Sequence, residues 1–271
     1  MSIYFIIIIG MLLFQYILEI LVNILNLRAL KPSLPNEFKD TFDEDKYIKS
    51  QEYTKTNTKF SFITSTFSLI VNLTFIFGGI YNYIDILVRN YGYDANLTGL
   101  LFFGFLFIIN DILNIPFSLY KTFIIEEKFG FNKTTITTYL SDKLKGYFLA
   151  ILIGGPVLYL ILYFFSTYTS YGWLYVWMFL VSFSILMQPI FTTFIAPMFN
   201  KFTPLEDGPL LSRIKNYLKE VNFPVAKLEV IDGSKRSSHS NAYFSGIGKY
   251  KRIALFDTLL EQMNDDEILS I

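Results

Sequence analysis

The run KRSSHSNAYFSG, Lys235–Gly246, and the run KRIALFDTLL, Lys251–Leu260, decide the fold of the C-terminal region. Asn241–Phe244 alternates polar and apolar positions, and Arg252–Phe256 is a second segment of the strand type. Gly246 lies between them, with Gly248 two residues later, and glycines at this place favour a tight turn. We therefore predict a strand, a hairpin turn and a second strand.

The next segment, NDDEILSI, predicts the start of a helix. Asn264 is a good N-cap residue, and the acids Asp265 and Asp266 lie at the positive end of the helix dipole. Ile268 begins an apolar face, but so few residues make a marginal helix. We therefore expect the natural chain to continue past Ile271.

Upstream of the hairpin, the sequence predicts one helix and one strand. Gly208-Pro209 opens a helix with apolar residues at three- and four-residue spacings, and Asn222-Phe223-Pro224 ends it. Leu228–Ile231 is the strand, closed by Asp232-Gly233. The order helix, strand, loop, strand, strand, helix start is typical of an α+β domain.

The rest of the chain has the composition of a membrane protein. Hydrophobic residues make up 52% of the sequence and the mean hydropathy is +0.41, and a hydrocarbon core of about 30 Å needs about 20 helical residues. Five apolar segments free of Lys and Arg meet that requirement: 3–25, 62–84, 100–120, 147–165 and 173–196. These segments predict an all-α membrane bundle over residues 1–197, followed by the α+β domain over residues 198–271.

The basic residues predict how the bundle is oriented. The successive loops and the C-terminal region carry 7, 1, 5, 0 and 10 Lys and Arg. Because cytoplasmic loops are enriched in Lys and Arg, this alternation predicts an outside or lumenal N-terminus and a cytoplasmic C-terminal domain. The formal net charge is zero, so no global attraction to nucleic acid is expected. The lipid bilayer is the expected surrounding.

Polar and helix-breaking residues mark particular points of the bundle. Glu19 and Asp111 lie within predicted spans, where ionisable groups usually face protein or water; Asp111 is the stronger indication of a polar interior, since Glu19 could snorkel. Gly154-Gly155-Pro156 and Gln188-Pro189 predict kinks. The charged segment Lys31–Lys59 is expected to be a solvated loop that extends a helix.

Two further runs, EEKFGFN at Glu126–Asn132 and IAPMFNKFTP at Ile195–Pro204, occur in order with KRSSHSNAYF and KRIALFDTLL. Together these runs resemble the CaaX prenyl protease type I family, which are integral-membrane zinc endopeptidases of the gluzincin class. The resemblance covers essentially the whole chain. It implies a seven-helix family fold around a large aqueous chamber, of which five helices would be present here. It also implies that residues 198–271 are the start of a zincin-like peptidase domain, truncated before its metal-binding helix.

The same resemblance implies a substrate-binding strand at Asn241, Ala242 and Tyr243. In gluzincins such a strand lies antiparallel to an extended peptide, so the backbone near Ala242 would add the substrate as an extra strand and the Asn241 amide would bond its main chain. His239 either borders this cleft or is a hydrogen-bonded loop residue. Lys235 and Arg236 either meet a substrate carboxylate or form a solvated basic turn, and we favour the turn.

The zinc chemistry of the family needs residues that this sequence does not contain. In an HExxH helix, two histidines one turn apart bind the metal and the intervening Glu activates its water. This chain has one histidine and no HExxH, so we assign it no catalytic residue and no metal ligand. The 271 residues alone are predicted to be inactive, with zinc expected in the complete enzyme.

Two functions of different classes remain open. The first is the N-terminal part of a membrane zinc metalloendopeptidase that cleaves near the C-terminus of prenylated CaaX substrates, or that acts in membrane-protein quality control. The second is a non-catalytic membrane protein that binds peptides or docks with a protease. A transporter ranks last, because neither paired broken helices nor internal symmetry is visible.

Overall fold

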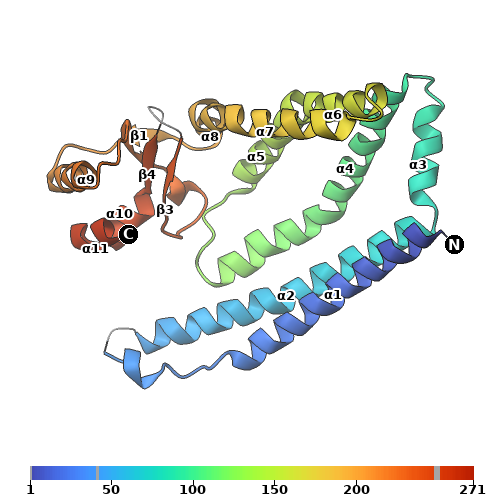
Figure 1. The fold of residues 1–271 in the computed structure, drawn as a ribbon. Helices are drawn as coiled ribbons and strands as arrows, with labels where there is room; N and C mark the ends of the chain where they lie inside the picture. Colours follow the sequence, from blue (N-terminus) through green and yellow to red (C-terminus); the bar gives the residue numbers. More distant parts are fainter. Residues whose placement is uncertain (1, 41–42, 247–250) are drawn as a thin grey trace. The chain divides into compact units, whose positions relative to one another are not determined.

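The structure is a computed structural model that describes residues 2–40, 43–246 and 251–271 (Figure 1). The chain forms two compact units. The first comprises Met1–Asp94 with Leu101–Phe129, and the second comprises Ala95–Leu100 with Gly130–Ile271.

The regular secondary structure in the described residues of the first unit is all helical. It contains α1 (Ile3–Ala29), α2 (Glu44–Phe77), α3 (Ile80–Arg89) and most of α4 (Ala95–Tyr120), which continues as a π-helical turn over Lys121–Glu126. A short 3-10 turn, Asn36–Phe38, lies between α1 and α2. This is the all-helical architecture that the apolar runs predict.

Helix α2 differs from its predicted bounds at both ends. It begins within the charged segment, because the Asp43 side chain caps it by accepting a 2.9 Å hydrogen bond from the backbone N–H of Lys46. It ends at Phe77 because Gly79 adopts a left-handed conformation, with φ +67°. The predicted span 62–84 therefore runs past the end of α2 into the separate helix α3, and much of the predicted loop Lys31–Lys59 is helix.

The second unit begins with the helices α5 (Ile136–Leu149), α6 (Gly155–Thr167), α7 (Gly172–Ile190) and α8 (Ala196–Phe199). π-Helical turns join α5 to α6 over Ala150–Gly154 and α7 to α8 over Phe191–Ile195.

Each of these two turns ends two residues before a proline, Pro156 or Pro197. A proline cannot donate to the carbonyl one turn back, and the N–H before it bonds five residues back instead, from Gly155 to Ala150 and from Ala196 to Phe191. A π-helical turn thus lies next to Gly155-Pro156, where the sequence predicts a kink. At Gln188-Pro189 the backbone is still the α-helix α7, and the π-helical turn begins only at Phe191. The kinks themselves stay predictions.

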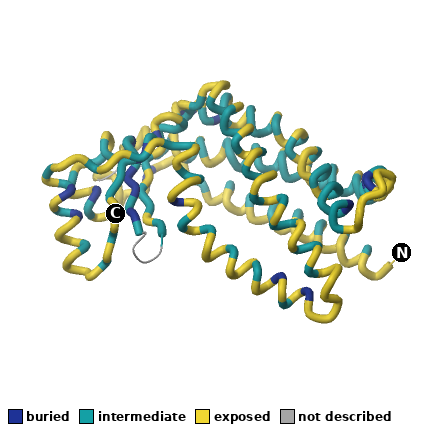
Figure 2. Tube along the Cα trace, turned by 90° about the horizontal axis from the view of Figure 1, so that it is seen from above, coloured by how far each residue is buried: buried dark blue, intermediate teal, exposed yellow. Residues whose placement is uncertain are grey.

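Five helical stretches within the described residues are long and apolar enough to cross a membrane: Ile3–Ala29, Glu44–Phe77, Ala95–Glu126, Ile136–Thr167 and Gly172–Phe199. Their most apolar windows are almost unburied, and neither α1 nor α2 contains a buried residue. Figure 2 shows most of the helical trace as exposed or intermediate. A water-soluble protein rarely exposes so much contiguous apolar surface. A lipid-facing surface explains it.

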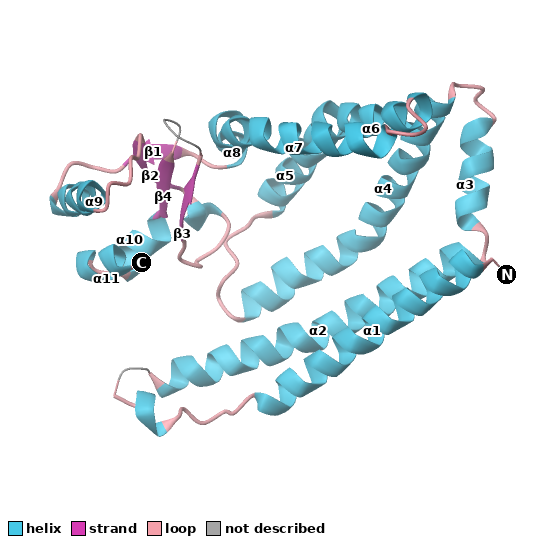
Figure 3. Cartoon of the chain, in the orientation of Figure 1, coloured by secondary structure: helices cyan, strands magenta, loops and turns pink. Residues whose placement is uncertain are grey.

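The second unit also contains a four-stranded sheet of mixed direction, drawn in magenta in Figure 3. Its strands are β1 (Phe202–Pro204), β2 (Lys227–Ile231), β3 (Ala242–Ser245) and β4 (Arg252–Phe256), in the order β1-β2-β4-β3. β2 and β4 are parallel, and both outer pairs are antiparallel.

Three helices accompany the sheet: α9 (Pro209–Glu220), α10 (Asp257–Gln262) and α11 (Asp265–Ser270). The buried residues Ile214, Leu255, Leu259 and Ile268 join α9, β4, α10 and α11 into one apolar core. The fold class predicted from the sequence, a membrane helical bundle followed by an α+β domain, is confirmed.

Candidate functional site

Strand β3 forms one edge of the sheet in the described part of the chain. Of the four predicted substrate-binding residues, Ala242 and Tyr243 lie in β3 and Asn241 directly precedes it. Its pairing with β4 sets Ala242 opposite Leu255 and Tyr243 opposite Ala254. One residue earlier, the Asn241 carbonyl accepts a 3.0 Å hydrogen bond from the Phe256 N–H. Hydrogen-bonded and non-bonded pairs alternate in an antiparallel ladder. The N–H and C=O groups of Ala242 and Phe244 therefore point away from β4, toward the open edge.

The side chain of Asn241 lies at this edge. Asn241 is exposed, and its Oδ1 accepts a 2.9 Å hydrogen bond from the N–H of Ala242. The amide thus satisfies the first outward-facing donor of β3 when no peptide lies there. An arriving peptide carbonyl would compete with Oδ1 for that N–H.

Tyr243 and Phe244 project from opposite faces of β3. Tyr243 is partly buried and contacts Phe256 edge-on, with ring centroids 6.4 Å apart. Burial raises the pKa of the Tyr243 phenol; Arg252 lowers it and Glu229 raises it by smaller amounts. Tyr243 is therefore neutral at physiological pH. Phe244 is 70% exposed, which makes it the apolar side chain of β3 most available for contact.

His239 lies in the loop before β3, and its ring stacks on Phe131 with centroids 4.1 Å apart. Its backbone carbonyl accepts a hydrogen bond from the buried Thr258 hydroxyl, at 3.0 Å. These contacts belong to a well-anchored loop residue. A contact between His239 and a substrate stays a prediction.

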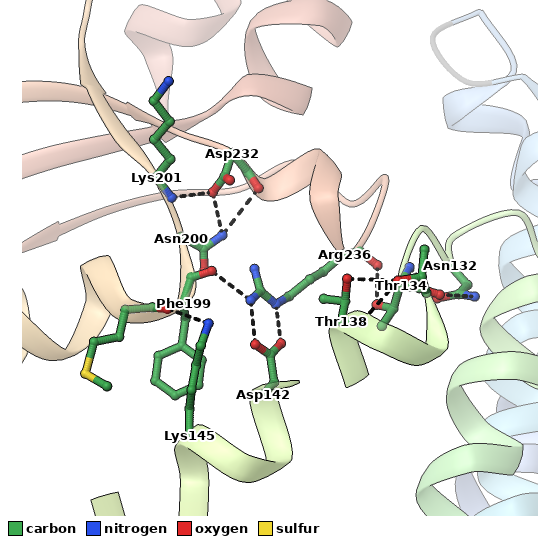
Figure 4. A network of polar contacts seen from close by, with 12 residues as sticks. Asn132, Thr134, Thr138, Asp142, Lys145, Phe199, Asn200, Lys201, Asp232 and Arg236 are labelled. Carbon is green, nitrogen blue, oxygen red and sulfur yellow. Dashed lines mark hydrogen bonds and ion pairs between the residues drawn. The ribbon is translucent and has the colours of Figure 1, made fainter. Parts of the chain in front are cut away.

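The expectation of a solvated basic turn is wrong for Arg236. Figure 4 shows its guanidinium paired with Asp142 of α5: Nε donates to Oδ2 at 2.7 Å and Nη2 donates to Oδ1 at 2.9 Å. Nη2 also donates to the carbonyl of Phe199. Lys235, in contrast, is exposed. The sequence carried no local signal for this pair, because Asp142 lies 94 residues earlier.

The first unit contains an open pocket of about 620 Å³ with a mixed polar and apolar lining. Its lining residues include Asn23, Asn57, Asn114 and Lys121. Nearby, the Ser65 hydroxyl donates to the Glu19 carboxylate. Glu19 therefore faces a protein partner on α2, and the polar interior expected around Asp111 stays a prediction.

The described residues contain no group of three or more His, Asp or Glu side chains that could hold a metal ion. A catalytic zinc site needs three protein ligands. The residues present do not fit a catalytic zinc, so no metal-dependent step can be assigned to them.

Two consecutive parts of the chain match known protein families. Residues 23–201 match the family described as CAAX prenyl protease N-terminal, five membrane helices, and residues 204–271 match Peptidase family M48.

The curated relatives and a solved structure agree with these matches. The chain is 42% identical to CAAX prenyl protease 1 of Saccharomyces cerevisiae, over 88% of this chain and 55% of that protein. It is 37% identical to CAAX prenyl protease 1 homolog of Arabidopsis thaliana, over 97% of this chain and 64% of that protein. The crystal structure of S. mikatae Ste24p superposes with a TM-score of 0.92 at 38% identity, covering 99% of this chain and 65% of that one.

The chain thus spans about half to two-thirds of the length of the relatives it matches. The two family matches follow one another and together cover residues 23–201 and 204–271. With five helices suited to cross a membrane, it is an integral membrane protein. The chain belongs to the CAAX prenyl proteases of Peptidase family M48.

Proposed function

We propose that the chain is the N-terminal part of a membrane zinc metalloendopeptidase that cleaves peptide bonds near the C-terminus of prenylated substrates. The observation that carries the proposal is the open edge of β3, where Asn241, Ala242 and Tyr243 lie. The second support is that the chain belongs to the CAAX prenyl protease family. Several relatives are named as CAAX prenyl proteases. Membrane-protein quality control is the alternative physiological role for the same activity.

The residues of this chain would bind and orient the substrate. An extended peptide would pair with the outward N–H and C=O groups of Ala242 and Phe244, which recognise any backbone irrespective of its side chains. Asn241 would release the Ala242 N–H and turn its amide to the peptide main chain. Exposed Phe244 would contact apolar substrate side chains. Zinc in the complete enzyme would supply the hydrolytic chemistry, through ligands that these 271 residues do not provide.

The experiment is a peptidase assay on the natural protein purified from its own membranes. A farnesylated peptide that ends in a CaaX sequence is the substrate, and the release of its last three residues is followed with and without a zinc chelator. We expect hydrolysis that the chelator abolishes and added zinc restores.

Replacing Asn241 with Ala should raise KM about tenfold, since a lost hydrogen bond to a desolvated peptide group costs about 1–3 kcal/mol. Asn216→Ala, on the exposed surface of α9, is the matched control and should leave KM unchanged. Binding without hydrolysis by the wild-type protein would favour the alternative function, a non-catalytic membrane protein that binds peptides.

A further inference from the structure

The Arg236–Asp142 pair is much less exposed than an ordinary surface ion pair. Its side chains are 23% and 26% exposed, whereas those of Arg89 and Asp85 are 65% and 36% exposed. The two parallel hydrogen bonds to one carboxylate fix the orientation of the guanidinium. A third hydrogen bond, to the Phe199 carbonyl, restrains it further. The pair therefore ties α5 and the end of α8 to the loop that carries Arg236.

The backbone around Arg236 is held as firmly as its side chain. The Arg236 carbonyl accepts hydrogen bonds from the Lys133 N–H and the Thr134 hydroxyl, both at 3.0 Å. Ser237 bridges to Asn132, and the Ser238 N–H donates to the Phe131 carbonyl at 3.0 Å. The loop thus lies like a short strand along residues 130–134, as Figure 4 shows for Thr134 and Arg236.

The opposite side of the same loop is attached to the segment that follows β4. The Gln262 amide donates to the Ser238 carbonyl at 2.9 Å, and Thr258 donates to the His239 carbonyl. Two residues after His239, the Asn241 carbonyl makes the first bond to β4. Residues 236–241 are therefore hydrogen-bonded on both sides, so the start of β3 can move little relative to the Asp142 carboxylate.

We propose that Arg236 is a positioning residue of the peptide-binding strand and that it acts through Asp142. Anchored to α5 by the bidentate pair, Arg236 sets where β3 begins and so where the outward groups of Ala242 and Phe244 lie. Arg236 makes no contact with substrate in this role. The inference about peptide binding rests on the function proposed above, whereas the anchoring of β3 is a property of this chain alone.

The first test measures amide hydrogen exchange of Asp142→Asn in the membrane protein. This substitution removes the charge and one of the two parallel bonds at nearly constant volume. We expect exchange of the Ser238, Tyr243 and Ser245 amides to accelerate about tenfold, since bonds to charged groups are the stronger ones. Asp85→Asn, which removes the exposed pair with Arg89, is the matched control and should leave these amides unchanged.

Amides of α9 report whether the variant is folded. If they also lose protection in Asp142→Asn, the decisive variant is Arg236→Lys, which keeps the charge but cannot make two parallel bonds. Unchanged exchange of Ser238, Tyr243 and Ser245 in a folded variant of either kind would overturn the proposal.

The second test separates positioning from stability by kinetics on the natural enzyme. A residue that only stabilises the fold would lower the amount of active enzyme without changing KM. If Asp142→Asn displaces the peptide-binding strand, this variant should show a KM about tenfold higher for a farnesylated CaaX peptide. Its kcat per folded molecule should stay within about twofold of wild type. An unchanged KM would contradict the proposal. A wild-type protein without peptidase activity would refute the proposed function, and the exchange result would still decide the anchoring.

Discussion

Asp257 connects the end of β4 with the loop that leads to β3. Its carboxylate accepts hydrogen bonds from the Ser234 hydroxyl and from the N–H groups of Ser234 and Thr258, the latter two at 2.9 and 2.8 Å. Burial raises the pKa of Asp257, but the bonds from Ser234, Thr258 and Gly233 together lower it below its ordinary value. The ionised form is therefore favoured in the folded protein.

This shift gives a prediction for stability against pH. A carboxyl whose pKa is lower in the folded than in the unfolded state stabilises the fold above the unfolded pKa of about 3.9. That contribution is lost as pH falls from about 4 through the folded pKa. Asp257→Asn should be less stable than wild type at pH 7, and the difference should shrink below about pH 4. Denaturant unfolding at both pH values measures it, and a difference independent of pH would contradict the assignment.

At the residue scale, the sequence predicted local chemistry and missed distant partners. Asn264 was expected as an N-cap, and its side chain accepts bonds from the Asp266 and Glu267 N–H groups in a full capping box. That motif lies within four residues, so its pattern is visible in the sequence. Arg236 was misread because a charged turn residue gives no local indication of a partner on α5.

At the scale of the element, the alternation of bonded pairs in β3 predicts two different outcomes for proline. Ala242→Pro removes an N–H that faces the open edge and takes no part in pairing with β4, and proline is tolerated at such edge positions. We expect a nearly unchanged melting temperature and a loss of peptide binding. Tyr243→Pro is the matched control: it removes a donor to β4 and should lower the melting temperature clearly. Equal melting temperatures for the two variants would contradict the assigned pairing.

The elements that the sequence predicted best have strong local patterns. β2, β4 and α9 were recognised from alternation or from helical spacing. β1 was missed, because its three residues end in Pro204 and are ordered by pairing with β2, more than 20 residues later. No helix was assigned to α10, since its six residues follow β4 without a break. Short elements of this kind depend on tertiary contacts that a local pattern does not contain.

At the scale of the whole molecule, the distribution of basic residues predicts the orientation in the membrane. Within the second unit, the Ser166 hydroxyl donates to Asn96 Oδ1 at 2.9 Å, which joins the end of α6 to the start of α4. Both helix ends adjoin segments that are poor in Lys and Arg. The Arg236–Asp142 pair joins two segments from regions rich in them. This grouping fits the alternation of basic residues along the sequence. The outside or lumenal N-terminus and the cytoplasmic C-terminal domain stay a prediction.

Single cysteines can test that orientation, because the 271 residues contain no cysteine of their own. Ser170→Cys lies between α6 and α7 and Asn216→Cys lies on α9, and both positions are exposed. In sealed cells or vesicles of native orientation, a membrane-impermeant maleimide should label Ser170→Cys and leave Asn216→Cys unlabelled until the membrane is opened. The reverse pattern would mean that the bundle is inserted the other way.

The most direct test of peptide binding at β3 is amide hydrogen exchange in the natural membrane protein, with and without a farnesylated CaaX peptide. The Ala242 and Phe244 amides face the open edge, so an added peptide strand should slow the exchange of Phe244 about tenfold or more. The Ala242 amide should slow less, because the peptide replaces its bond to Asn241 Oδ1. The Tyr243 amide, already bonded to β4, should change much less. If the peptide binds and the Ala242 and Phe244 amides exchange at their unbound rates, the substrate strand lies elsewhere and the assignment of β3 is wrong.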